Sequence, residues 1–164
     1  MKRTLRVVIA AFMLMLCMTG CGKEQDELLD YLNGSARKEV TKLEQKARDS
    51  YSSVTGDNYK DDATAVQELS TNTADLLKQT IDKAADMGKK LEGEKLKKVH
   101  EQYVTSLKDL QSGVDQYVQA MEDGDADKMT QVNEVLGKSN DEREKYQEDL
   151  KKLAKELDVE IQEK

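Results

Sequence analysis

The clearest chemistry in this sequence lies at Cys21. This cysteine ends a lipobox-like segment, Leu16-Cys17-Met18-Thr19-Gly20-Cys21, in which an apolar residue stands three positions before Cys21 and small residues stand directly before it. A lipoprotein pathway attaches a diacylglyceryl group to such a thiol, and cleavage then makes the cysteine the mature N-terminus. The spacing therefore predicts lipid attachment at Cys21.

The residues before Cys21 have the layout of an export signal. Three basic residues stand among the first six, and an apolar run of about 12 residues follows, too short for a hydrocarbon core of ~30 Å. We expect residues 1–20 to be a lipoprotein signal peptide, 21–25 a lipid-anchored tether and 26–164 a helical bundle domain. The protein would then be lipid-anchored on the extracytoplasmic face of the cell membrane. The alternative is an ordinary secretory signal that ends near a cysteine.

An acidic turn has spacing that resembles a metal site. Asp123, Asp125, Asp127 and Glu134 occupy positions 1, 3, 5 and 12 of a calcium loop, but Lys128 stands where an EF-hand requires glycine. The sequence favours a solvated turn in which Asp125 caps the following helix. We therefore predict no metal site here.

The single histidine and the tyrosines complete the list of candidates. One histidine excludes a histidine-rich metal site, and we expect His100 to lie at the boundary of the core. Four tyrosines should fill the core with their hydroxyls reaching the surface, the alternative being a stacking platform for sugar rings: Tyr51, Tyr103, Tyr117 and Tyr146. No serine or cysteine nucleophile is spaced with a base. The sequence therefore predicts no catalytic residues, no cofactor and no enzymatic activity.

The composition favours long helices. Loss of residues 1–20 removes three of the 26 basic residues and none of the 33 acidic ones, so the net charge changes from −7 to −10. The chain has no proline and is rich in Ala, Leu, Glu, Lys and Gln, which are good helix formers. Because nucleic-acid binding needs a basic face, this charge argues against a nucleic-acid partner.

Four stretches carry apolar residues at helical spacing, approximately over residues 29–54, 66–91, 96–121 and 129–157. No such stripe remains buried by itself, so we expect an all-α fold, an antiparallel up-down four-helix bundle after a cleaved lipoprotein signal peptide. The alternative is a longer coiled-coil hairpin. The first stripe follows an 11-residue period: Leu29, Leu32, Ala36, Val40, Leu43, Ala47, Tyr51 and Val54.

Glycine and capping residues predict the helix boundaries. Asn33-Gly34 should kink or delay the first helix, and Gly56 should end it. Asn58 should cap the second helix, whose stripe is weakest because Thr73 occupies one of its positions. The polar middle of the fourth helix should pack loosely.

Three short segments resemble a known group of proteins. Tyr31-Leu32-Asn33, then Ser53-Val54-Thr55-Gly56-Asp57-Asn58-Tyr59 with Asp61-Asp62, then His100-Glu101-x-Tyr103, are similar to segments of small, uncharacterised helical-bundle lipoproteins of Gram-positive bacteria. The resemblance covers most of the chain after Cys21 and rests on capping and packing residues. It implies a helical fold and an envelope location, and no active site.

Up-down topology would place the turns at 56–62 and 122–128 far from the membrane. A lysine-rich turn at 89–98 would return toward it, and its lysines would face anionic headgroups. The candidate partner surface is therefore the distal, acidic end: Asp57, Asn58, Tyr59, Asp123 and Asp125.

The sequence favours a non-catalytic, membrane-anchored lipoprotein that acts as a binding or interaction module at the cell envelope. Its partners would be the membrane, through the N-terminal lipid, and an envelope protein or cell-wall component. One alternative is a ligand-sensing or accessory subunit with a pocket between the second and fourth helices. Thr73, Ser139 and Arg143, on stripe positions, motivate that alternative. A cell-wall-active enzyme is the least favoured reading.

Overall fold

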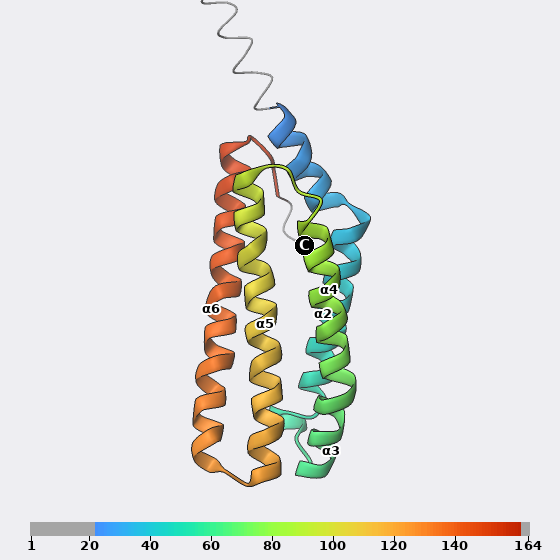
Figure 1. The fold of residues 1–164 in the computed structure, drawn as a ribbon, viewed down its shortest axis with the longest axis vertical. Helices are drawn as coiled ribbons and strands as arrows, with labels where there is room; N and C mark the ends of the chain where they lie inside the picture. The colour runs from blue at the N-terminus through green and yellow to red at the C-terminus, as the bar shows by residue number, and fades with distance from the viewer. Residues whose placement is uncertain (1–21, 162–164) are drawn as a thin grey trace, which may run out of the picture.

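The computed structural model describes residues 22–161, which are all-helical and contain no strand (Figure 1). The predicted signal peptide and Cys21 lie outside the described residues. In the described part of the chain, a helix over residues 22–33 comes first. The other elements are α2 (Ser35–Ser52), the 3₁₀ turn η1 (Gly56–Asn58), α3 (Asp62–Glu68), the π-helical segment η2 (Leu69–Thr73), α4 (Ala74–Gly88), α5 (Glu94–Asp123) and α6 (Ala126–Glu156). The prediction of an all-α fold is confirmed.

The helices form a bundle along one long axis (Figure 1). α5 packs most extensively against α6, α2 packs against α4, and α4 joins the two pairs by packing against α5. The helix at residues 22–33, the α4–α5 connection and the end of α6 share one end of the bundle, while η1 and the α5–α6 turn lie at the other (Figure 1). Residues 22–25, expected in a tether, are helical.

Gly34 bends the first helical segment, as predicted. Its backbone is extended, and a Cβ there would come within 2.5 Å of the carbonyl oxygen of Asp30, so a side chain would collide with backbone. The bend changes which face is buried: Leu28 and Tyr31 enter the core, whereas Leu29 is 39% exposed and Ala36 is exposed. The expected stripe was wrong in this first part because it continued one helix face straight through the glycine.

The second segment differs from the expected regular helix. Asp61 caps α3, since its carboxylate accepts hydrogen bonds from the Thr64 backbone and hydroxyl at 2.8 and 3.0 Å. Asn58 does not cap α3; its amide donates to the Ser52 carbonyl at the end of α2, at 2.9 Å. The π-helical turn η2 then inserts a wider turn between α3 and α4. The cap prediction at Asn58 is therefore wrong.

The turn between α5 and α6 forms as expected. Gly124 adopts a left-handed conformation with φ of 63°, which lets α5 end sharply. The carboxylate of Asp125 accepts hydrogen bonds from the backbone N–H groups of Asp127 and Lys128 at 3.0 and 3.1 Å. Gly56 is also left-handed, with φ of 58°, but lies beyond the end of α2 at Ser52 and opens η1.

The core has two apolar clusters along the axis. The one nearer residue 22 includes Leu28, Tyr103 and Tyr146, and the distal one includes Leu69, Leu77 and Val114. Four of the buried polar residues lie at the levels where the clusters meet: Glu44, Thr80, Ser106 and Ser139. Ser139, in the polar middle expected for α6, is therefore part of an interior layer, while most of its neighbours in that stretch are exposed.

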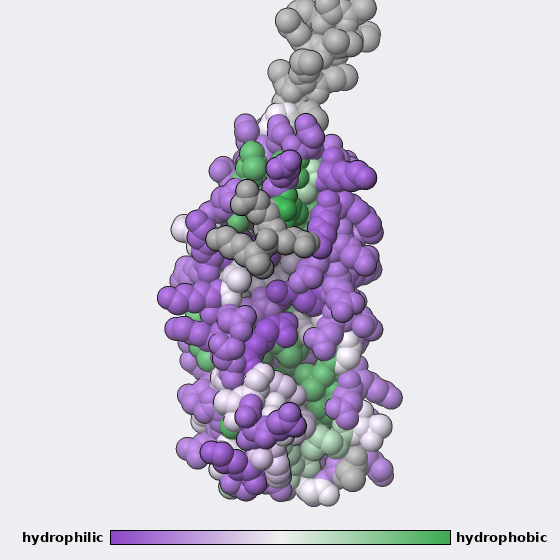
Figure 2. All heavy atoms as spheres, turned by 180° about the vertical axis from the view of Figure 1, so that it is seen from behind, coloured by the Kyte–Doolittle hydropathy of each residue, from purple (hydrophilic) through white to green (hydrophobic). Residues whose placement is uncertain are grey.

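The surface is mostly hydrophilic. On the face in Figure 2, apolar residues come to the surface in the lower half and close to the upper end, with hydrophilic residues around them. Within residues 22–161, no helix is long and apolar enough to cross a membrane.

Candidate functional site

Glu44 is the centre of the interior polar layer. It is 3% exposed, and its Oε2 accepts a hydrogen bond from the Tyr103 hydroxyl at 2.7 Å. Its Oε1 pairs with Arg48 Nε at 3.1 Å and with Arg143 Nη1, so one carboxylate from α2 faces two arginines, one from α2 and one from α6. Burial lowers the pKa of both Arg48 and Arg143. One anion therefore holds a cation of its own helix and, across the bundle, one of α6.

A third arginine lies beside this layer without a carboxylate partner among the described residues. The guanidinium of Arg37 lies 5.0 Å from the ring centre of Tyr103 and 5.5 Å from those of Tyr31 and Tyr146. Its Nη1 is buried and has no hydrogen-bond partner. Arg143 also lies over the Tyr103 ring, at 5.1 Å. Cation–π attraction therefore accommodates Arg37 where an ion pair is absent.

His100 is buried in a chain of hydrogen bonds, which corrects the expectation that it lies at the core boundary. It is 2% exposed; Nε2 lies 2.8 Å from the Ala84 carbonyl oxygen and Nδ1 lies 3.0 Å from the Tyr31 hydroxyl. A carbonyl only accepts, so Nε2 donates to Ala84. In the neutral ring Nδ1 accepts from Tyr31, whose oxygen accepts in turn from Tyr146 at 3.1 Å.

The four tyrosines predicted to fill the core separate into two groups. Tyr103 and Tyr146 are fully buried, and their rings stack with centres 4.9 Å apart. Their hydroxyls form hydrogen bonds inside the protein instead of reaching the surface. Burial raises the pKa of Tyr103 far above its usual range. Tyr51 and Tyr117 are half-buried in the distal half, and their ring centres lie 6.4 Å apart.

The protonation of His100 should make stability depend on pH. Burial lowers the pKa of His100 below the value of 6.5 expected in the unfolded chain. As pH falls below 6.5 the unfolded state binds a proton that the folded state does not, so the free energy of unfolding decreases, by at most ~1.4 kcal/mol per pH unit. Urea unfolding between pH 7.5 and 5.0 measures this loss. His100→Gln should remove it, and the same slope in both proteins would contradict the assignment.

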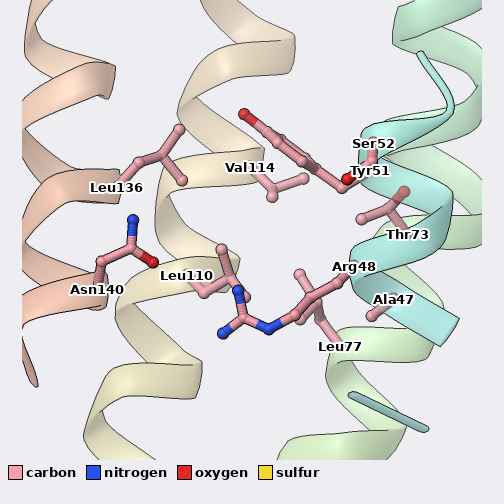
Figure 3. A pocket seen from close by; sticks show the side chains of 10 residues that line it. All are labelled: Ala47, Arg48, Tyr51, Ser52, Thr73, Leu77, Leu110, Val114, Leu136 and Asn140. Carbon is pink, nitrogen blue, oxygen red and sulfur yellow. The ribbon is translucent and has the colours of Figure 1, made fainter. Parts of the chain in front are cut away.

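A groove lies on the distal side of the polar layer, between α2 and α6. It has a volume of about 390 Å³, and we call it the α2–α6 groove (Figure 3). Its ten lining residues include five aliphatic ones, Ala47, Leu77, Leu110, Val114 and Leu136. Arg48 is the one charged residue among the ten, and Figure 3 shows the Nη end of its guanidinium pointing into the space between the helices. Ser52 and Asn140, both exposed, form a polar rim.

The residues that motivated an interhelical pocket have different positions. Thr73 lines the α2–α6 groove, and its hydroxyl bonds to that of Ser50 at 2.7 Å. Ser139 is buried and donates to the Ser106 carbonyl at 2.8 Å, while Arg143 pairs with Glu44. The groove thus lies between the first and fourth predicted helices instead of the second and fourth, and one of the three residues lines it.

The five residues of the candidate partner surface belong to η1 and the residue after it and to the α5–α6 turn, which lie at the distal end of the bundle (Figure 1). Asp57, Asn58, Tyr59 and Asp123 are exposed, and Asp125 is half-buried. Tyr59, 44% exposed, donates to Asp62 at 2.7 Å, and Asp123 pairs with Lys128 at 2.6 Å. The end is acidic and accessible, with several of its side chains in local contacts. Cys21, the predicted lipid attachment site, lies outside the described residues.

Acidic residues pair with lysines of the lysine-rich turn at residues 89–98. Lys89 pairs with Asp86 at 2.8 Å, and Lys97 pairs with Glu94 at 3.1 Å. The carboxylate of Glu27 accepts from the backbone N–H groups of residues 92 and 93 at 2.5 and 2.9 Å, which ties the first helix to this turn. Over residues 22–161, no group of three or more His, Cys, Asp or Glu side chains is arranged to hold a metal ion.

Sequence reasoning missed Glu44, Arg37 and Tyr31. A signal existed for the first two, because Arg37, Val40, Glu44 and Ala47 follow one another in steps of three and four. A charged residue at such a position lies on the inner face and therefore needs a partner inside. Tyr31 was hidden by the bend at Gly34.

No protein-family model matches this chain, and neither a curated protein nor a solved structure matches it.

Proposed function

We propose that this protein is a non-catalytic, membrane-anchored extracytoplasmic lipoprotein that acts as a binding or interaction module at the cell envelope. In this proposal the helices form an antiparallel up-down four-helix bundle behind a cleaved signal peptide, and the lipid on Cys21 holds it to the membrane. The partner is an envelope protein or cell-wall component that meets the acidic distal end. The lipobox spacing before Cys21 is the single observation that carries the anchor.

The position of the first helix supports the orientation. Gly22, the first described residue, follows Cys21 and is helical, and it lies at the end of the bundle opposite to η1 and the α5–α6 turn (Figure 1). A lipid on Cys21 would therefore leave the distal turns facing away from the bilayer. Their negative charge adds to this tendency, because anionic headgroups repel it within a Debye length of ~8 Å.

The anchor is tested by substitution of each cysteine. Cys21→Ser should abolish incorporation of radiolabelled palmitate in growing cells, since the thiol that takes the lipid is gone. Cys17→Ser is the matched control. It also replaces one sulfur atom by oxygen in the same segment, and it should leave labelling intact. Labelling that survives in Cys21→Ser, or is lost in Cys17→Ser, would contradict the proposal.

The α2–α6 groove favours a second candidate function, that of a ligand-sensing or accessory subunit. Cavities of ~300–1,000 Å³ that are mostly apolar and hold a few polar groups are typical of small-molecule sites. The groove meets this description with its aliphatic lining and one arginine, and its ten lining residues include no carboxylate. In this second reading the lipid anchor holds a ligand-binding bundle at the membrane.

A further inference from the structure

We propose that the α2–α6 groove binds a small amphiphilic carboxylate, with an alkyl body over the apolar floor and the carboxylate against the guanidinium of Arg48. The inference rests on the second candidate function above and names its ligand class. It is independent of the lipid on Cys21.

The shape and lining of the groove select an apolar body. Leu110 and Val114 of α5 and Leu77 of α4 form its floor, while Ala47 and Leu136 line its two walls (Figure 3). Because α2 and α6 do not pack extensively against each other, the floor between them is not covered by a helix. Each methylene group that enters such a space leaves water, which tightens binding about three- to four-fold.

The arginines select an anionic head. Three arginines, Arg37, Arg48 and Arg143, lie in or beside the interior layer, and Glu44 is the one described carboxylate that pairs with any of them. Arg143 Nε and Arg37 Nη1 are buried without hydrogen-bond partners. A chain of strongly negative overall charge thus holds a local excess of positive charge inside, at the end of the groove where Arg48 lies.

The geometry selects a single carboxylate instead of an acidic peptide. Arg48 is the one charged residue that lines the groove, and its side chain is 35% exposed, so one anionic group satisfies it. Glu44 occupies Nε of Arg48, and the Nη end points into the groove (Figure 3). A planar carboxylate matches the guanidinium geometry, and the rim at Ser52 and Asn140 offers polar groups beside it.

The test uses the full-length chain in lipid nanodiscs and a decanoate that carries a photoreactive diazirine near its alkyl end. Mass spectrometry of the photolysed protein should find label on residues that line the groove, and unlabelled decanoate should compete. Decyl alcohol and decyltrimethylammonium, with the same chain and no carboxylate, should compete at least ten-fold more weakly, since a hydrogen bond to a charged group contributes that much. Octanoate should compete about ten-fold more weakly than decanoate.

Matched variants separate the charge from the cavity. Arg48→Met should weaken competition by decanoate ten- to a hundred-fold, whereas Lys46→Met, which removes a cation from the exposed face of the same helix, should not. Asn140→Phe should block the groove from its exposed rim. Gln147→Phe, at an exposed α6 position that does not line the groove, should leave binding unchanged. Circular dichroism confirms that each variant is folded.

Three outcomes would overturn this inference: labelling spread outside the groove, equal competition by decyl alcohol, or decanoate binding that is unaffected by Arg48→Met. Palmitate labelling at Cys21 is measured separately. If the chain is lipidated but binds no decanoate, the proposed groove ligand is wrong and the proposed anchor stands. If the chain binds decanoate but is not lipidated, the proposed anchor is wrong and the proposed groove ligand stands.

Discussion

Glu44→Gln is expected to lower the free energy of unfolding by about 3 kcal/mol. Removal of one partner from a buried ion pair costs ~3–5 kcal/mol because the other charge remains buried and unpaired. Here two arginines, Arg48 and Arg143, lose their common carboxylate, and the Tyr103 hydroxyl loses its charged acceptor. The lower end of the range applies because both arginine side chains are partly exposed, so water screens them.

Chemical denaturation monitored by circular dichroism measures this loss. The control is Glu39→Gln on the same helix, whose carboxylate pairs with Lys83 at 2.9 Å but is 54% exposed. An exposed pair contributes at most ~1 kcal/mol, so this variant should unfold close to the wild type. If the two variants lose the same stability, Glu44 does not hold the arginines as described.

Leu28→Ala should be comparably severe, with a loss of ~2–5 kcal/mol. The side chain of Leu28 is fully buried in the cluster that also contains Tyr31, Met87 and Leu157. Truncation to alanine leaves a cavity in a cluster to which the first helix, α4 and the residue directly after α6 all contribute. The expected result is a lower midpoint in urea with an unchanged slope.

Leu29→Ala is the internal control, because the two leucines are neighbours and make the same chemical change. Leu29 is 39% exposed and should lose less than ~1 kcal/mol. The pair tests the bend at Gly34 directly, since a straight first helix on the expected stripe would bury Leu29 instead. A larger loss for Leu29→Ala would show that the first helix has the other register.

The sequence by itself determined the helical class of this chain and the positions of most turns. The stripe from Leu96 to Val114 in α5 is buried as predicted, and so is the stripe that begins at Tyr146 in α6 and ends at Leu157, directly after it. Gly124 and Asp125 form the predicted turn and cap. These features depend on local physics, because helical spacing, a left-handed glycine and a carboxylate cap act over a few consecutive residues.

Part of the site was also visible in the sequence. Thr73, Ser139 and Arg143 stood at inner positions where an apolar residue was expected, and all three have polar partners there in the structure. The identity of those partners was not visible. Pairing of Arg143 with Glu44 joins residues 99 positions apart, and it depends on how far α6 is shifted and rotated relative to α2.

Only the tertiary structure decided the rotation of each helix about its axis. The bend at Gly34 moves Leu29 out of the core and Tyr31 into it, and the π-helical turn η2 changes the register between α3 and α4. Each departs from the regular 3.6-residue period on which a stripe of apolar residues is recognised. The α2–α6 groove follows from those rotations, and so does the layer in which two arginines pair with Glu44 and Arg37 lies over tyrosine rings. They depend on contacts between helices far apart in the chain, which the periodicity of one helix does not encode.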